Sequence, residues 1–373
     1  MSLKKRKDSD NCDLPKLSQS SIDLLKELEE VAKDVGNDNS SKEIPDKMTF
    51  LNLMGGISAC RKMPGIPNHM GYEDIYKCED EGNAEMVRKS LKEMFGIEDM
   101  ESLMNCLNDY DCDNQFRDFY SFWREHPVFD IKRLHPDAKI MFTTCMDFAS
   151  QLYPFTKSKG FYAWDVNEQI GLCRRAFACG IISEDEFSEQ LENYYYRVSG
   201  FFDNWGEYAM SCVCGAAYWM YTASRYSIEE AEQFLELNQK LALELLKDDG
   251  AWGRYGWLSL SNKKYVLSAS EMLQLIPEDF EGAQGCFISD RITVDGMKIG
   301  YMYREEGDDE YPDSGWRFMA GDEDQEYMDN SDNIGVYHLN TACNLDMDII
   351  PFLTQPPYVA YIRDENGRFV KDE

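Results

Sequence analysis

The chain contains one long apolar stretch, Met210-Ser-Cys-Val-Cys-Gly-Ala-Ala-Tyr-Trp-Met-Tyr-Thr-Ala223. Its roughly 14 residues are too few to span a bilayer, which needs about 20. An uncharged segment of this length is typical of a helix that is buried on all sides. We therefore expect Met210–Ala223 to form a buried helix in a helical body.

Helix signals extend on both sides of this stretch, from Met48 to Leu275. Pro136 suits the first position of a helix, whereas Gly96 and Gly180 suit helix ends. A serine followed three residues later by glutamate forms a capping box, which starts a helix. This pattern occurs at Ser183/Glu186, Ser227/Glu230 and Ser268/Glu271. Together these signals predict a mainly α-helical domain over residues 48–275.

Residues 1–47 differ from this body because they are mostly polar and charged. They contain one amphipathic segment, which begins near Ser21 and ends at Gly36. We interpret residues 1–47 as a flexible N-terminal lead with one short helix.

The pattern changes after Pro277, where alternating and β-branched residues replace the helical spacing. Asp295-Gly296 is a typical hairpin turn and predicts a β-hairpin between Cys286–Val294 and Met297–Arg304. Asn366-Gly367 is a second turn signal. Further strands are predicted at Trp316–Ala320, Ile334–Leu339 and Tyr358–Arg363. We therefore expect a smaller α+β, β-rich C-terminal module over residues 282–373.

The chain is strongly acidic, with a formal net charge of −31. Residues 282–373 alone hold 20 acidic and 7 basic residues. Nucleic acids and anionic lipids are bound through lysine and arginine, so neither is an expected partner. A basic protein would be attracted, although a high acidic charge also serves solubility alone. Lys4-Lys5-Arg6-Lys7 is not followed by an apolar core, so we expect no signal peptide and a cytoplasmic protein.

Twelve cysteines are scattered along the chain, and only four histidines occur. Without an export signal, reduced core thiols are the expected state of the cysteines. No histidine lies near a cysteine pair at zinc-finger spacing, and Cys212 and Cys214 would point to different faces of a helix. The sequence predicts neither a metal site nor a cofactor.

No familiar catalytic motif is present, and the expected function is not enzymatic. The chain lacks a Gly-x-Ser-x-Gly elbow, a phosphate-binding loop and a Gly-x-Gly-x-x-Gly fingerprint. The acidic run from Asp322 to Glu326 does not follow the EF-hand spacing. A solvated loop, a partner-binding surface and a cation site remain open for this run. The many aromatic residues of the helical part are either core or the rim of a binding groove, which leaves a possible site at Trp164, Asp165 and Trp205.

Two parts of the chain resemble known families. The first runs from about residue 130 to 260 and includes Gly160-Phe-Tyr-Ala-Trp-Asp165, Cys179-Gly-Ile-Ile-Ser-Glu-Asp-Glu186, Asn204-Trp-Gly-Glu-Tyr208 and Gly215-Ala-Ala-Tyr-Trp219. It resembles the helical family called domain of unknown function 1266, which implies no activity. That family usually has arginine one turn after the Trp-Asp pair and after the later glycine. Glu168 and Ala216 stand there in this chain.

The second part covers about residues 282–373. Its segments Ser289-Asp-Arg-Ile-Thr-Val-Asp-Gly-Met-Lys-Ile-Gly-Tyr-Met-Tyr-Arg304, Asp313-Ser-Gly-Trp-Arg-Phe-Met-Ala-Gly-Asp-Glu323 and Tyr327-Met-Asp-Asn330 resemble domain of unknown function 2185. This family is grouped with immunity protein family 33, whose members are thought to protect bacteria from toxins. The resemblance implies a non-enzymatic protein that neutralises a bacterial toxin by direct binding.

A basic toxin domain would suit an acidic module with an aromatic anchor among its carboxylates. The candidate binding residues are Asp313, Trp316, Asp322, Glu323, Asp324 and Glu326, and Trp316 is alternatively a core residue of the module. Two other functions remain open from the sequence: an enzyme or small-ligand binder with a pocket among the aromatic helices, and a protein-docking scaffold.

Overall fold

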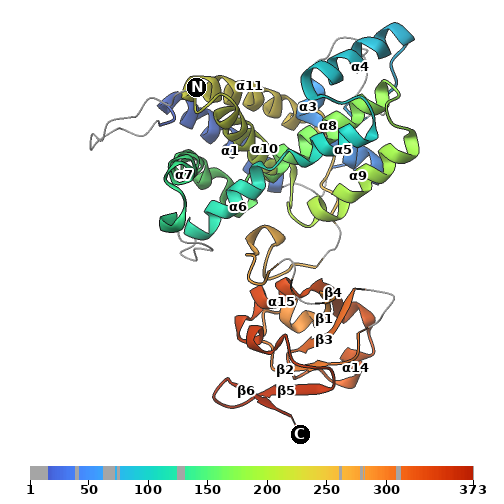
Figure 1. The fold of residues 1–373 in the computed structure, drawn as a ribbon. Coiled ribbons are helices and arrows are strands. Elements are labelled where there is room, and N and C mark those ends of the chain that lie inside the picture. The colour runs from blue at the N-terminus through green and yellow to red at the C-terminus, as the bar shows by residue number, and fades with distance from the viewer. Residues whose placement is uncertain are drawn as a thin grey trace. The chain divides into compact units, whose positions relative to one another are not determined.

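The computed structural model describes residues 16–37, 42–61, 72–73, 76–123, 131–259, 263–277, 280, 282–307 and 312–372. The chain divides into two compact units, Met1–Leu260 and Ser261–Glu373. The first unit is helical and the second contains a β-sheet (Figure 1). The predicted fold class, a helical body followed by a smaller β-rich module, is confirmed.

The helical unit consists of α-helices, with two 3-10 turns among its described elements. Its described elements are α1 (Gln19–Asn37), α2 (Lys47–Met54), α3 (Gly56–Cys60), α4 (Glu81–Phe95), α5 (Met100–Asn108), α6 (Cys112–Trp123), η1 (Ile131–Arg133), α7 (Pro136–Thr156), η2 (Lys157–Lys159), α8 (Tyr162–Ala178), α9 (Glu184–Ser199), α10 (Trp205–Ala223), α11 (Ile228–Leu246) and α12 (Ala251–Arg254).

Helix α10 contains the apolar stretch and is buried along most of its length, as predicted. It packs against α1, α7, α8 and α11. Gly215 permits the contact with α8, because a Cβ atom there would lie 2.4 Å from the Cβ atom of Trp164. Gly206 likewise permits the contact with α1, where a Cβ atom would lie 2.3 Å from the carbonyl oxygen of Ala32.

The helix expected in the N-terminal lead is α1, and it belongs to the core of the helical unit. Leu25 and Leu28 are fully buried, and α1 packs on α10 and α11. Its apolar face therefore completes the bundle, and this part of residues 1–47 is not a separate lead. Residues 1–15 and 38–41 of the lead lie outside the described residues.

The predicted helix ends are largely found where the sequence placed them. Ser183 and Glu186 form the capping box of α9, and the Ser227 side chain caps α11. Pro136 is the first residue of α7, and Gly96 ends α4 in the left-handed conformation. Ser268 and Glu271 also form a capping box, but it starts only the 3-10 turn η3 (Ala269–Glu271). A cap signal thus marks a turn start without determining the length of the helix that follows.

The C-terminal unit is built on one mixed sheet. Strands β1 (Gly285–Ser289), β2 (Tyr301–Arg304), β3 (Asp313–Met319), β4 (Ile334–His338), β5 (Val359–Arg363) and β6 (Phe369–Lys371) lie in the order β4-β1-β3-β2-β5-β6. Only β1 and β3 are parallel. Helices α13 (Asp290–Thr293), α14 (Gln325–Met328) and α15 (Leu339–Leu345) and the 3-10 turns η4 (Ser331–Asn333) and η5 (Met347–Phe352) connect the strands.

The predicted hairpin across Asp295-Gly296 is wrong, because β1 and β2 are not neighbours in the sheet. Ser289 caps the short helix α13, so the chain leaves the sheet after β1. Asp295-Gly296 then ends this helix: the Asp295 N–H donates to the Asp290 carbonyl at 3.0 Å, and Gly296 has φ +77°. The same dipeptide serves either turn, because both need a residue with positive φ.

The core of the C-terminal unit lies between one face of the sheet and the elements α13, α15 and η5. Fully buried members include Cys286, Ile288, Met302, Phe318 and Ala342. Ile276 joins this core, and the Leu275 and Leu273 N–H groups donate at 2.8 Å to Asn340 and Asn344. Residues 272–276 are therefore part of the C-terminal unit. The division lies before Ser261, earlier than the boundary at Leu275 that the sequence indicated.

Eleven of the cysteines lie among the described residues, each as a free thiol, and eight of these are buried. Their burial fits the expected role as small core residues. In the described part of the chain no helix is long and apolar enough to cross a membrane.

Candidate functional site

The segment Gly160–Asp165 leads from η2 into α8 and contacts the start of α6. Trp164 is fully buried and packs against Trp219 of α10 at a ring distance of 5.8 Å. Trp205 is also buried and stacks on Trp252 at 5.4 Å. Of the three residues that the sequence proposed as a helical site, both tryptophans are core residues. Asp165 differs, because it lines a pocket.

Asp165 and Asp113 each cap the first turn of the other residue's helix. The Asp165 carboxylate accepts the backbone N–H groups of Cys112 at 3.3 Å and Asp113 at 2.9 Å, which are the first residues of α6. The Asp113 carboxylate accepts the N–H of Phe161, just before α8, at 3.0 Å. Each acid satisfies N–H groups that the first turn of a helix leaves without partners. These hydrogen bonds hold the first turns of α6 and α8 in contact.

Gly160 permits this arrangement. It has φ +56°, and a Cβ atom there would lie 2.5 Å from the Asp113 carboxylate. Arg117, one turn along α6, donates to the same carboxylate at 3.1 and 3.2 Å. The negative charge of Asp113 is therefore compensated by Arg117 within the helical unit.

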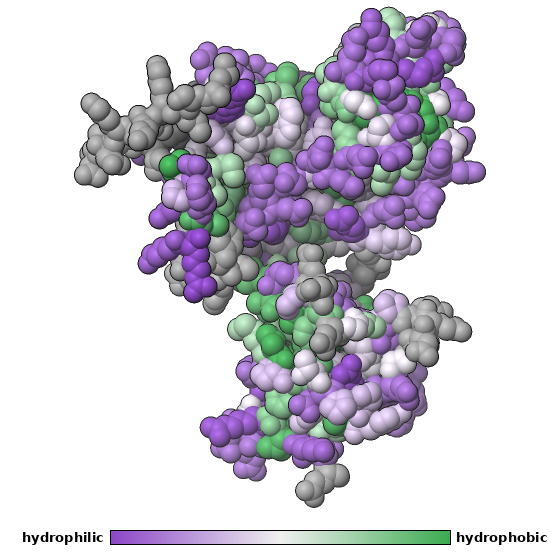
Figure 2. All heavy atoms as spheres, viewed as in Figure 1, coloured by the Kyte–Doolittle hydropathy of each residue, from purple (hydrophilic) through white to green (hydrophobic). Residues whose placement is uncertain are grey.

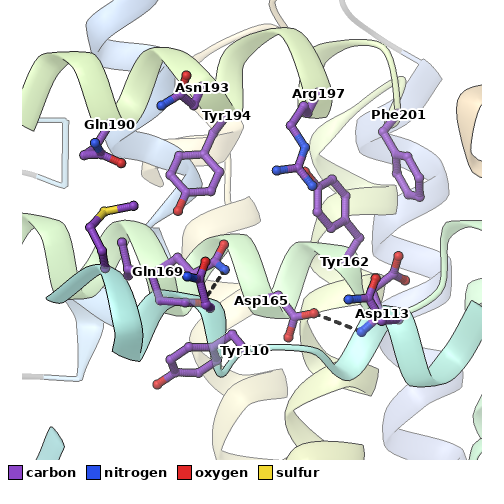
Figure 3. A pocket seen from close by; sticks show the side chains of 14 residues that line it. Tyr110, Asp113, Tyr162, Asp165, Gln169, Gln190, Asn193, Tyr194, Arg197 and Phe201 are labelled. Carbon is purple, nitrogen blue, oxygen red and sulfur yellow. Dashed lines mark hydrogen bonds between the residues drawn. The ribbon is translucent and has the colours of Figure 1, made fainter. Parts of the chain in front are cut away.

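A pocket of about 680 Å³ opens beside these two acids, between α5, α6, α8 and α9 (Figure 3). Helix α9 contributes one face, since residues three, four and seven positions apart lie on the same side of a helix. The lining consists of Met104, Leu107, Asn108, Tyr110, Asp113, Asn114, Tyr162, Asp165, Gln169, Gln190, Asn193, Tyr194, Arg197 and Phe201. It holds five carboxamides and three tyrosines, so it offers hydrogen bonds and aromatic faces together.

The electrostatics of the pocket follow from burial. Desolvation raises the pKa of Asp165 to about 8, although the N–H groups of Asp113 and Cys112 oppose the shift. Burial also raises the pKa of Tyr162 and of Tyr110 to about 12, so both phenols are neutral. Arg197 lies over the Tyr162 ring, 5.6 Å from its centroid. The pocket thus contains neutral hydrogen-bonding groups and one exposed cation.

Glu168 stands where the resemblance led us to expect arginine. It forms an ion pair with Arg61, which follows α3, and accepts a hydrogen bond from Asn167 at 2.7 Å. The Arg61 guanidinium lies 5.2 Å from the centroid of the Trp164 ring. Ala216, the second departure, is fully buried in α10. Glu168 is therefore the acid of an ion pair whose cation, Arg61, stands at the C-terminal end of α3.

In the C-terminal unit, the acidic run lies after β3 and is partly neutralised. Arg291 donates to Asp322 at 3.2 and 2.5 Å and holds the pKa of that carboxyl below its usual range. The Glu323 carboxylate accepts the N–H groups of Ala320 and Gly321 at 2.8 and 2.7 Å. Asp324 caps α14 by accepting the Tyr327 N–H at 2.8 Å. Three of the four predicted steering acids therefore also hold the local structure.

Glu326 is exposed and makes no hydrogen bond or ion pair within the described residues. Asp329 and Asp332 are also exposed and follow it within six residues. No lysine or arginine occurs in the sequence between Arg317 and Arg363. The segment 322–332, which we call the acidic segment, is consequently an exposed negative surface.

Trp316 is fully buried in the core of the C-terminal unit, which is the alternative that the sequence left open. Its indole N–H donates to the Leu353 carbonyl at 3.2 Å. Asp313 accepts two hydrogen bonds from Arg317, at 2.9 and 2.8 Å. Asp313 and Arg317 line a mostly apolar hollow of about 580 Å³, together with Gly285, Phe287, Glu306, Pro312 and Val336.

This hollow lies on the face of the sheet opposite to the core. Phe287 and Val336 are paired across β1 and β4, and Val336 is 69% exposed. The Arg317 guanidinium covers the Phe287 ring at 4.5 Å. Val336 thus exposes apolar surface beside the ion pair of Arg317 and Asp313.

The structure brings together residues that no local motif connects. Arg197, Tyr162 and Asp113 come from three helices, and nothing in their sequence surroundings marked them as neighbours. Only Asp165 carried a signal, through its place in the Trp-Asp pair. The acidic segment was visible in the sequence, but its internal partners Arg291 and Tyr327 were not.

Among the residues that the structure describes, no group of three or more histidines, cysteines or acids is arranged to hold a metal ion. Residues 90–257 match the model of the family described as Protein of unknown function (DUF1266). Residues 286–373 match the model described as Immunity protein Imm33 domain. Comparisons with curated proteins and with solved structures gave no match. The two family models thus match consecutive parts of the chain, in the two-part arrangement that its motifs indicated.

Proposed function

We propose that the protein is a non-enzymatic, immunity-type inhibitor that neutralises a bacterial toxin by binding it directly. The observation that carries this proposal is the match of residues 286–373 to an immunity protein domain. The partner in this proposal is a basic toxin domain, and the C-terminal unit is the part that binds it.

Charge supports the choice of partner. Every described arginine from 282 to 363 is used within the C-terminal unit: Arg291, Arg317 and Arg363 form ion pairs, and Arg304 donates to backbone carbonyls. Glu326 and its exposed neighbours in the acidic segment are left facing solvent. Opposite charge accelerates the encounter of two proteins, and an inhibitor must capture its toxin quickly.

The apolar hollow beside Val336 supplies the other requirement of a stable complex. Affinity depends mainly on a few desolvated contacts, and charges on the rim contribute mostly to the association rate. Trp316 is not available for such a contact, because it is buried. We therefore assign anchoring to Val336 and Phe287 and steering to the acidic segment.

The first experiment identifies the partner and measures the charge effect. The full-length chain is used as bait in lysates at low and moderate salt, and the recovered toxin is then studied by stopped-flow association. Glu326→Gln with Asp329→Asn removes two exposed charges but keeps the acceptor that Gln325 uses on residue 329. We expect association to slow severalfold at low salt and the salt dependence to weaken.

The control, Glu85→Gln with Asp248→Asn, removes the same charge from exposed positions of the helical unit. It should change the association rate much less. Equal effects of the two double variants would mean that net charge, and not the acidic segment, attracts the partner.

A second pair of variants tests the anchor. Val336→Ser removes apolar surface from the hollow, whereas Met94→Ser removes it from α4 in the helical unit, and both side chains are 69% exposed. Only Val336→Ser should increase the dissociation rate. Unchanged dissociation, or binding retained by a chain that ends before Ser261, would contradict the assignment to the C-terminal unit.

A further inference from the structure

The pocket of the helical unit contains a cation that the rest of the unit does not use. Most described cations near it have carboxylate partners: Arg117 binds Asp113, Lys159 binds Asp203, and Arg61 binds Glu168. Arg197 forms no ion pair or hydrogen bond within the described residues, although the chain has a net charge of −31. It lies over Tyr162, at the edge of the pocket (Figure 3).

The carboxylates of the pocket do not compensate Arg197. Asp113 is paired with Arg117 and with the Phe161 N–H. Asp165 faces the first turn of α6, and burial favours its neutral form because it raises the pKa of the carboxyl to about 8. Arg197 therefore leaves the pocket locally positive, on a unit whose visible surface is mostly hydrophilic (Figure 2).

The lining also holds hydrogen-bonding groups without partners. The hydroxyl oxygen of Tyr162 is buried and makes no hydrogen bond to another described residue, which is costly for a polar group. The Gln190 and Asn193 amides of α9 have no hydrogen bond to another described residue, whereas Gln169 already donates to the Leu107 carbonyl at 2.9 Å. A ligand in the pocket could bind the two amides in place of water, whereas the Tyr162 hydroxyl is enclosed.

We propose that this pocket binds a small phosphorylated metabolite. Its phosphate group pairs with the Arg197 guanidinium, whose fork of N–H donors matches phosphate oxygens. Its polar body hydrogen-bonds to the carboxamides of Gln190 and Asn193. The volume of about 680 Å³ is typical of a pocket for such a molecule. This function is separate from toxin binding, so either proposal can fail alone.

Calorimetric titration of the full-length chain tests the proposal with two phosphorylated probes, adenosine monophosphate and glucose 6-phosphate, and with adenosine and glucose as their neutral counterparts. We expect at least one phosphorylated probe to bind and its neutral counterpart to bind at least tenfold more weakly. If neither phosphorylated probe binds at millimolar concentration, or if the neutral counterparts bind equally well, the proposal is wrong.

Arg197→Gln should weaken binding of the phosphorylated probe at least tenfold. The matched control is Arg225→Gln, which removes the same charge from another exposed arginine of the helical unit without an ion pair among the described residues. It should bind as the wild type does. Equal losses in both variants would show that the probe responds to overall charge and not to the pocket.

Tyr162→Phe changes the lining of the pocket without removing a charge. The hydroxyl has no hydrogen-bond partner among the described residues, so its removal should leave thermal stability unchanged or slightly raised. Because the hydroxyl is enclosed, binding of the phosphorylated probe should also be unchanged, which makes this variant a second control for Arg197→Gln. A loss of binding equal to that of Arg197→Gln would mean that the probe responds to any change in the lining, and would contradict the specific role of Arg197.

Discussion

Asp165 and Asp113 are two acids that the fold holds close to each other at the starts of α8 and α6. Burial is the main reason that the pKa of Asp165 rises to about 8, and the neighbouring Asp113 carboxylate adds to the shift. The N–H groups of Cys112 and Asp113 stabilise the ionised form but do not outweigh desolvation. Asp165 should therefore keep its proton in the folded protein at neutral pH and lose it on unfolding.

This difference predicts a pH dependence. Between about pH 4 and pH 8 the folded state binds one more proton than the unfolded state, so the contribution of Asp165 to stability falls as pH rises and is level above that window. Asp165→Asn does not titrate. Urea unfolding, followed by fluorescence, should show the variant gaining on the wild type by at least about 1 kcal/mol from pH 5 to pH 8.

Asp248→Asn is the control for this measurement, because Asp248 is exposed. Its stability should keep a constant offset from the wild type over the same range. A constant offset for Asp165→Asn as well would mean that Asp165 is ionised in the folded protein.

At the scale of elements, the first turns of α6 and α8 lie against each other because a carboxylate of each helix caps the start of the other. Gly160 makes the approach possible through its positive φ and the missing side chain. Gly180, after the other end of α8, also has positive φ (+76°), but no atom lies within 4 Å of a Cβ placed there. A side chain at Gly180 would therefore cost stability only through the backbone conformation, whereas one at Gly160 would also clash with Asp113.

Gly180→Ala should cost about 1 to 2 kcal/mol, the penalty of a left-handed residue with a side chain. Gly160→Ala should cost distinctly more, because its Cβ atom would displace Asp113 from the Phe161 N–H and from Arg117. Thermal melting of the two variants provides the comparison. Equal costs would show that the contact between the helix starts adjusts without loss.

At the scale of the molecule, the core of each unit includes a segment from outside the domain that the sequence predicted. The core of the helical unit is completed by α1 from the N-terminal region, whereas the core of the C-terminal unit includes Ile276 from the segment before the sheet. A segment predicted as part of a flexible lead and a residue between the two predicted domains therefore each complete a core.

A fragment of residues 261–373 should consequently be more stable than one of residues 282–373. The shorter fragment loses the burial of Ile276 and the hydrogen bonds from Leu273 and Leu275 to Asn344 and Asn340. We expect a difference of at least about 2 kcal/mol in urea unfolding. Equal stability would place the boundary of the folded unit at Gly282.

The sequence by itself determined the local features of this protein. Helix starts at Pro136, Ser183 and Ser227 and the buried helix over Met210–Ala223 follow from caps and composition, which act within a few residues. The same holds for the strands around Trp316 and Ile334. Motif order also indicated both families.

Only the tertiary structure decided which of these residues meet. Asp295-Gly296 fits a hairpin turn or a helix end equally well, and the pairing of β1 with β3 and β4 selects the helix end. The same reason applies to the pocket, where Arg197, Tyr162 and Asp165 converge from two helices separated by a turn, and Asp113 joins them from a third. Trp316 is core and Glu326 is surface because burial depends on long-range packing, which local sequence patterns do not specify.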